Sequence, residues 1–104
     1  MILPRFAAIL ADGLPFPVSH YYAHKQDPPY MVWHEYASAQ LWADDGERER
    51  KYQVEINFFT ESEFDPLDET IRELLEGNYI PYTYTVNYDP DENIIMHRYN
   101  CEVT

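Results

Sequence analysis

The sequence predicts an α+β fold: a single domain, residues 1–104, with a mainly antiparallel β-sheet, two helices packed on it and a projecting hairpin loop. Three observations lead to this prediction. Two segments carry apolar residues at helical spacing, and several others alternate between apolar and polar residues, as a strand with one buried face does. The order helix, strands, helix, strands favours α+β over alternating parallel units. A chain of 104 residues can bury one modest core.

The first helix is expected over Leu3–Asp12. Its apolar residues recur at helical spacing: Ile2, Phe6, Ile9 and Leu10. Pro4 is tolerated because it lies in the first turn, and Gly13 is a natural C-terminal cap. The segment Val18–Tyr22 follows two prolines, and we expect a short strand there at an edge of the sheet.

The middle of the chain predicts two strands joined by a long polar loop. Tyr30–Tyr36 is nearly continuous in apolar and aromatic residues, which is typical of a central strand. Tyr52–Thr60 alternates strictly and predicts a strand with one buried face. Between them, Ala37–Lys51 is polar and contains the turn signal Asp45-Gly46, so it predicts a projecting loop.

The second helix, expected over Pro66–Glu76, has the clearest local signals. Asp65 can cap it and proline suits its first position, while Gly77 ends it. One apolar stripe runs along it: Leu67, Ile71, Leu74 and Leu75. Two more alternating segments, Tyr82–Tyr88 and Ile95–Val103, predict the final strands.

Charge excludes one broad class of function. The formal net charge is −12, whereas a protein that binds duplex nucleic acid normally carries a basic patch. Solubility alone would account for such acidity. Met1–Leu14 is too short to span a membrane and suits a signal peptide poorly, and the single Cys101 reads as a buried hydrophobic residue of a reduced compartment. We therefore expect a cytosolic protein that does not act at a membrane.

The candidate chemical groups form no recognisable catalytic set. His20 and His24 are four residues apart, but their segment is not helical, so nothing brings them to one metal. Cys101 and His97 share a strand face at a separation too long for direct proton transfer. We expect no enzyme activity, no metal and no cofactor.

Two surface features suggest assembly. Leu41-Trp42 lies inside the polar loop and could anchor an interface, or else fold back onto the core. The neighbouring basic run contrasts with the acidic second helix, and such separate patches favour head-to-tail contacts, although a solvated charged hairpin would look the same. The expected interface residues are Leu41, Trp42, Asp44, Asp45, Arg48, Arg50 and Lys51.

The order of these motifs resembles the small tail-completion proteins of long-tailed phages and prophages, also called tail terminators or head-to-tail joining proteins. The resemblance covers nearly the whole chain. It rests on Leu14-Pro15-Phe16-Pro17-Val18, Pro29-Tyr30-Met31-Val32-Trp33, Trp42-Ala43-Asp44-Asp45, Lys51-Tyr52-Gln53-Val54-Glu55-Ile56 and Asp65-Pro66-Leu67. It implies a structural ring, commonly a hexamer, made in the bacterial cytoplasm and built into the virion tail. The implied partners are further copies of the chain, tail-tube protein and head-completion protein, with no catalytic residues.

In such a ring DNA would pass through without being bound. Carboxylates on the lumen would repel the genome over a Debye length of roughly 8 Å. Besides the two loop aspartates, the lumen-facing candidates are Glu47, Asp68, Glu69 and Glu73. The alternative function is a small acidic inhibitor that mimics DNA and binds a basic host protein.

Overall fold

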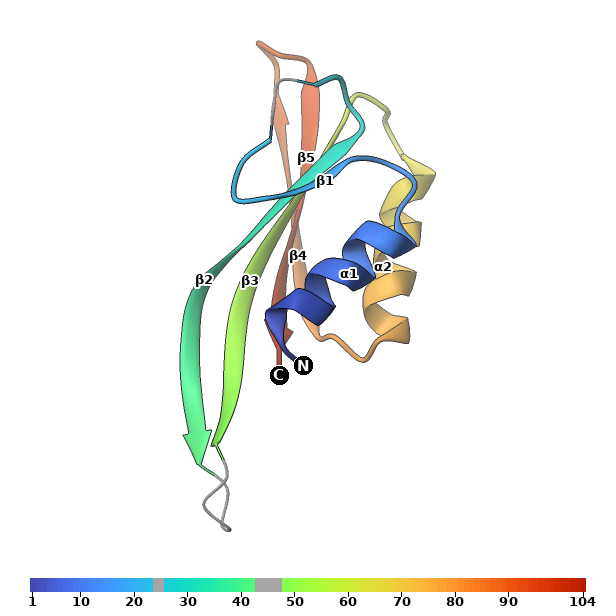
Figure 1. Ribbon diagram of the computed structural model, residues 1–104. Helices are drawn as coiled ribbons and strands as arrows, with labels where there is room; N and C mark the ends of the chain where they lie inside the picture. Colours follow the sequence, from blue (N-terminus) through green and yellow to red (C-terminus); the bar gives the residue numbers. More distant parts are fainter. Residues whose placement is uncertain (24–25, 43–47) are drawn as a thin grey trace.

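The computed structural model describes residues 1–23, 26–42 and 48–104, with the backbone alone for 40–42 and 48–49. Its elements, in chain order, are α1 (Leu3–Gly13), β1 (Val18–His20), β2 (Tyr30–Trp42), β3 (Arg48–Thr60), α2 (Pro66–Gly77), β4 (Tyr82–Asp89) and β5 (Ile94–Val103). The predicted α+β class is confirmed, as are both helices and the order of the elements (Figure 1).

The sheet has five strands in the order β1-β2-β3-β5-β4. All its pairs are antiparallel except β1 with β2, which is parallel. Both helices lie on one face of the sheet, and no described element covers the other face (Figure 1). We call this second face the open face.

A single core lies between the helices and the sheet. Phe6 and Leu10 of α1 and Ile71 and Leu75 of α2 are fully buried against alternate residues of β2, β3 and β5. The ring of Phe6 meets that of Trp33 edge-on, at a centroid distance of 5.2 Å. The predicted stripes are thus confirmed at their centres.

The ends of α1 differ from the prediction. Ile2 is the N-cap residue and is 67% exposed, so it does not belong to the stripe. Gly13 is the last helical residue rather than a cap in the left-handed region. A Cβ atom on Gly13 would lie 2.7 Å from Cδ1 of Leu74. The glycine therefore leaves room for the Leu74 side chain where the two helices approach.

The start of α2 is as predicted. The Asp65 carboxylate accepts a hydrogen bond from the backbone N–H of Leu67 at 2.9 Å. It also accepts one from the hydroxyl of Thr60, the buried last residue of β3, at 2.5 Å. The cap therefore ties the helix start to the sheet as well as satisfying a free donor.

The predicted loop Ala37–Lys51 is wrong in most of its length. β2 continues to Trp42 and β3 begins at Arg48, in continuous antiparallel register from Ala37↔Gln53 to Trp42↔Arg48. We call Ala37–Trp42 with Arg48–Lys51 the hairpin arm. Both faces of this two-stranded ribbon lie beyond the helices, so no apolar alternation is required of it. Polar composition, which suggested a loop, is compatible with such a strand pair.

The first strand is shorter than predicted but lies at the expected edge. β1 ends at His20, because Tyr21 adopts a left-handed backbone conformation with φ of 71°. The backbone N–H of Tyr21 still donates to the carbonyl oxygen of Trp33, at 2.8 Å. The molecule as a whole is elongated, with extents of 52 × 24 × 22 Å, and the arm extends one end of it (Figure 1).

Candidate assembly surfaces

The hairpin arm contains the backbone of three expected interface residues, Leu41, Trp42 and Arg48. The expected residues Asp44, Asp45 and Glu47 lie outside the described part of the chain. Arg50, also expected at the interface, is exposed on the arm.

Lys51, at the base of the arm, is paired within its own chain. Its Nζ lies 2.5 Å from Oε1 of Glu102 on β5. This hydrogen bond is the main cause that holds the pKa of Glu102 below its ordinary value. In the monomer Lys51 therefore already has a partner, whereas Arg50 is exposed on the arm.

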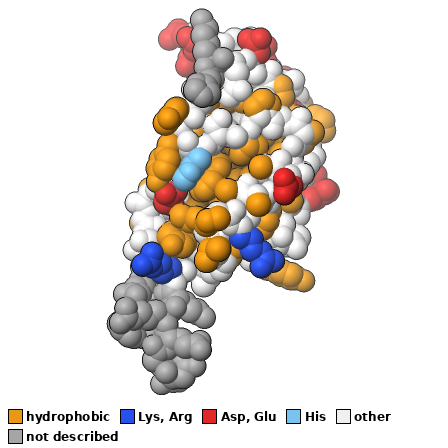
Figure 2. Space-filling model, viewed as in Figure 1, with side chains coloured by type: hydrophobic (Ala, Val, Ile, Leu, Met, Phe, Trp, Pro, Cys, Tyr) orange, Lys and Arg blue, Asp and Glu red, His pale blue; other side chains and the backbone are white. Residues whose placement is uncertain are grey.

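The opposite end of the molecule is acidic. The loop after β3 and the β4–β5 turn lie side by side there, since residues of both line one pocket. Five exposed carboxylates gather on these two segments, and their sequences contain no lysine or arginine: Glu61, Glu63, Asp89, Asp91 and Glu92. We call this group the acidic end. Figure 2 shows acidic side chains at this end and basic side chains toward the arm.

Helix α2 presents only part of its acidic sequence to solvent. Glu69 and Glu73 are exposed, as expected of lumen-facing candidates. Asp68 does not share their face. Its carboxylate accepts hydrogen bonds from the Tyr99 hydroxyl and, at 3.1 Å, from Nε of Arg72. Asp68 therefore connects the helix to the sheet, and its expected place on an outer acidic face is wrong.

A partly buried polar cluster lies beside Asp68. The hydroxyl of Tyr84 is 2.6 Å from Nδ1 of His97, which is 8% exposed, and the guanidinium of Arg72 lies 4.0 Å from the centre of the Tyr84 ring. Burial lowers the pKa of His97 and, together with the hydrogen bond to Asp68, raises that of Tyr99. His97 Nε2 is buried and no protein group hydrogen-bonds to it.

This cluster lacks a nucleophile. Cys101 is 1% exposed, and burial raises the pKa of its thiol to about 12. A thiol held protonated is a poor nucleophile. Cys101 is therefore a buried hydrophobic residue, as predicted, and the cluster supports packing between α2 and the sheet.

The histidines are held by neighbouring side chains. Nε2 of His20 lies 2.6 Å from Oε2 of Glu35, and the His20 ring stacks on Trp33 at 3.9 Å. Burial would raise the pKa of Glu35, but hydrogen bonds from Tyr21 and His20 outweigh it and lower that pKa. In the part of the chain that the structure describes, no three His, Cys, Asp or Glu residues are placed to hold a metal; His24 lies outside that part.

The open face carries a chain of polar contacts across three strands. Oε1 of Glu55 on β3 forms an ion pair with Nε of Arg98 on β5 at 3.1 Å, and Oε2 lies 3.7 Å from Nε2 of His34 on β2. Asn57 bonds to both partners of the central pair. Toward the acidic end, the rings of Tyr30 and Phe59 stack at 4.7 Å. The face is thus ordered, mixed in polarity and uncovered by the helices.

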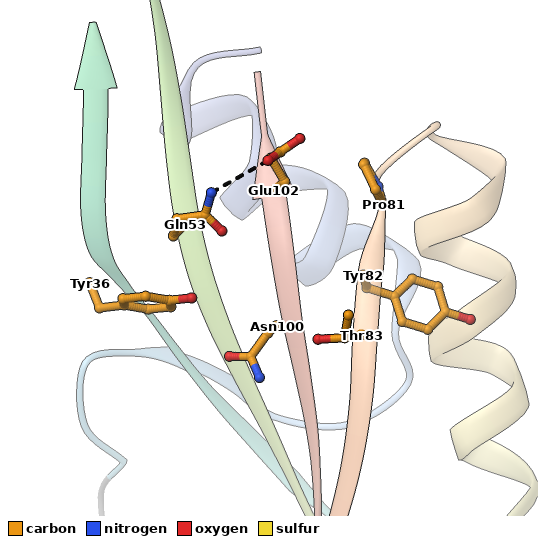
Figure 3. Close-up of a pocket in the computed structure, with 7 residues that line it drawn as sticks. All are labelled: Tyr36, Gln53, Pro81, Tyr82, Thr83, Asn100 and Glu102. Atoms are coloured by element: carbon orange, nitrogen blue, oxygen red, sulfur yellow. Dashed lines mark hydrogen bonds between the residues drawn. The ribbon is translucent and has the colours of Figure 1, made fainter.

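A shallow pocket on the open face extends from β2 to β4 near the base of the arm (Figure 3). Neutral polar groups dominate it, and Gln53 Nε2 donates to Oε1 of Glu102 at 3.4 Å. Its lining residues are Tyr36, Gln53, Pro81, Tyr82, Thr83, Asn100 and Glu102. These lining residues include no histidine, cysteine or serine.

Two strongly exposed aromatic residues were not predicted from the sequence. Phe64 and Tyr79, at either end of α2, are 92% and 93% exposed. Both adopt left-handed backbone conformations, with φ of 54° and 57°. Bulky residues rarely do so without a functional or packing reason. No sequence signal marks this backbone geometry, because glycine, the residue that usually adopts it, stands at neither position.

No family model and no curated protein matches this chain. Neither helix of the described residues is long and apolar enough to cross a membrane.

Proposed function

We propose that this chain is a ring-forming subunit that closes the finished tail tube of a long-tailed phage and joins it to the head. It would assemble in the bacterial cytoplasm and remain in the virion tail, bound to further copies, to tail-tube protein and to head-completion protein. The observation that carries the proposal is the combination of a projecting hairpin arm with the element order of such subunits: helix, strands around a projecting hairpin, capped acidic helix, final hairpin.

The charge distribution supports a head-to-tail contact. The arm, with Arg48, Arg50 and Lys51 in its sequence, forms one end of the molecule, and the acidic end lies at the other (Figure 1). Unlike ends on one molecule favour heterologous contacts, and these close into rings when the rotation allows it. Charge reversal at Arg50 should weaken assembly most at low salt, because exposed charges are then least screened. Arg5→Glu, at an exposed site on α1, changes the net charge equally and serves as the control.

The exposed carboxylates of α2 fit the passage of DNA. Glu69 and Glu73 would face the lumen of the ring and repel phosphates. A lumen with lysine or arginine would bind the genome and slow it. The lumen-facing assignment now excludes Asp68, because Tyr99 and Arg72 hold its carboxylate against the sheet.

The second candidate, an acidic inhibitor that mimics DNA, is favoured by the net charge of −12 alone. The two functions predict different partners. A ring subunit binds the end of purified tail tubes, whereas an inhibitor stays small and binds a basic host enzyme.

Deletion of the gene tests the proposed function. Cells without it should accumulate unjoined heads and tails, with tails of abnormal length, and a plasmid copy of the wild-type gene should restore joined particles. Electron microscopy counts both forms. Tails of normal length that join to heads in the deletion strain would show the proposed function to be wrong.

A further inference from the structure

The sheet has one long edge without the usual protection. β4 (Tyr82–Asp89) is an outer strand of the sheet, and no described strand pairs with its free side. Natural proteins protect such edges with lysine, proline, a bulge or a very short strand. β4 contains no lysine, arginine or proline, its register with β5 is unbroken, and its one charge is the terminal Asp89.

The other side of the sheet has a protected part and an unprotected part. β1 is three residues long and follows Pro15 and Pro17, and both features protect this edge from pairing with another chain. It pairs only with Met31–Trp33 of β2. Beyond the bulge between Glu35 and Ala37, the stretch Ala37–Trp42 has no described strand on its outer side. We call this stretch the β2 edge and Tyr82–Tyr88 the β4 edge.

Both edges are free of charge. Charged residues make up 25% of the chain, yet neither Ala37–Trp42 nor Tyr82–Tyr88 contains one. Two copies with a net charge of −12 repel each other overall, and neutral edges add no charge–charge repulsion when they approach closely. Their similar lengths would also allow full pairing.

The alternation of hydrogen-bonded and non-hydrogen-bonded pairs between β4 and β5 shows which backbone groups of the β4 edge are free to bond to another strand. The backbone N–H of Glu102 donates to the carbonyl of Pro81 at 3.0 Å, which makes Tyr82 and Cys101 a non-hydrogen-bonded pair. Alternate residues from Thr83 onward therefore bond to β5. The residues whose N–H and C=O groups point to the free side are Tyr82, Tyr84, Val86 and Tyr88.

We propose that the β4 edge of one subunit pairs with the β2 edge of a second copy, so that the sheets of neighbouring subunits become continuous. The two edges lie on opposite sides of the sheet, so each contact leaves one edge of each kind free for the next copy. Such a heterologous contact repeats until the ring closes. Pairing of β4 with another β4 would instead leave the neutral β2 edge uncovered. This inference rests on the proposed ring, since it names the surfaces through which ring subunits meet.

Substitution at Val86 tests the pairing. Val86→Pro removes an N–H that points away from β5, so the ladder within the subunit stays intact, while Val86→Thr is the matched control. Val86→Lys is a second variant, in which a charge protects the edge from pairing. It should fold normally, because the Val86 side chain is 51% exposed. Circular dichroism and thermal unfolding establish that each variant is folded.

The full chain is measured up to millimolar concentration by native mass spectrometry and amide hydrogen exchange. Wild type and Val86→Thr should associate beyond dimers, with slowed exchange at Tyr84, Val86 and Ala37–Trp42. The proline and lysine variants should associate about 10-fold more weakly or worse, as expected when an intermolecular hydrogen bond is lost and the edge is obstructed.

Four results would overturn the inference: no association of the wild type at millimolar concentration, equal association of the folded proline or lysine variants, assemblies whose edge amides exchange freely, or dimers protected on β4 alone. Failure of the proposed function can be distinguished from failure of the edge pairing. If deletion of the gene leaves phage normal while Val86→Pro still abolishes association, the pairing stands without the tail role. If Val86→Pro associates normally and restores phage, only the pairing is wrong.

Discussion

The two halves of strand β3 differ in what surrounds them. In the covered half, Val54, Ile56 and Phe58 are fully buried beneath the helices. In the other half, Arg48–Lys51 forms a ribbon with β2 that extends beyond them. The covered half has its residue types fixed by the core of this chain. The arm lies beyond the core, so the core does not determine its residue types, and we propose that these serve contacts outside the monomer.

Truncation of one side chain in the core and one on the arm should give the largest difference in stability. Ile71→Ala should lower the free energy of unfolding by about 2–5 kcal/mol, because Ile71 is fully buried between α2 and the sheet. Arg50→Ala on the arm should change it by less than about 0.5 kcal/mol. Chemical denaturation measures both. Similar losses at the two sites would mean that the arm belongs to the cooperative core.

Two glycines allow a sharper comparison within the covered region. Gly13→Ala places a methyl group 2.7 Å from Cδ1 of Leu74, so this flexible side chain must shift and the fold should be destabilised by about 1 kcal/mol. Gly77→Ala meets no atom within 4 Å and should be neutral or stabilising by up to about 1 kcal/mol. Thermal unfolding of both variants gives the two signs. Equal effects would show that α1 and α2 do not approach as closely as described.

A smaller effect should appear with pH in the covered region. Burial holds the pKa of His97 below its ordinary value of 6.5, so the unfolded chain takes up a proton first as the pH falls. Asp68 and Asp65 oppose this shift, whereas Arg72 adds to it. The contribution of neutral His97 to the free energy of unfolding should therefore be fully present above pH 6.5 and decline below it. The decline should be flatter in His97→Gln. Denaturation curves between pH 5 and pH 8 measure the slopes, and identical slopes would remove His97 from the account.

The sequence predicted best where local chemistry and packing agree. Asp65 and Pro66 marked the start of α2 because capping depends on neighbouring residues only. The alternation of Tyr52–Thr60 marked a strand because one of its faces is buried. Neither signal exists in the arm, where a strand with two uncovered faces has no hydrophobic period, and the same stretch was predicted to be a loop.

Features that depend on register were beyond reach of the sequence. Glu55 meets Arg98 and His34 only because β3 lies between β5 and β2 in one particular alignment. Asp68 turns toward Tyr99 rather than sharing the exposed acidic face of α2 for a similar reason, since the partner comes from a distant strand. Charge composition indicates an acidic protein, but only the fold separates the acidic end from the basic arm.

Charge reversal on the arm tests whether the arm joins heads to tails. A gene with Arg48→Glu, Arg50→Glu and Lys51→Glu is returned to the deletion strain, beside an Arg5→Glu control, and joined particles are counted by electron microscopy. We expect the arm variant to fold with an unfolding free energy within about 0.5–1 kcal/mol of wild type, because exposed ion pairs contribute little to stability. We also expect this variant to fail to restore joined particles. Full restoration of joined particles by the folded arm variant would contradict this expectation.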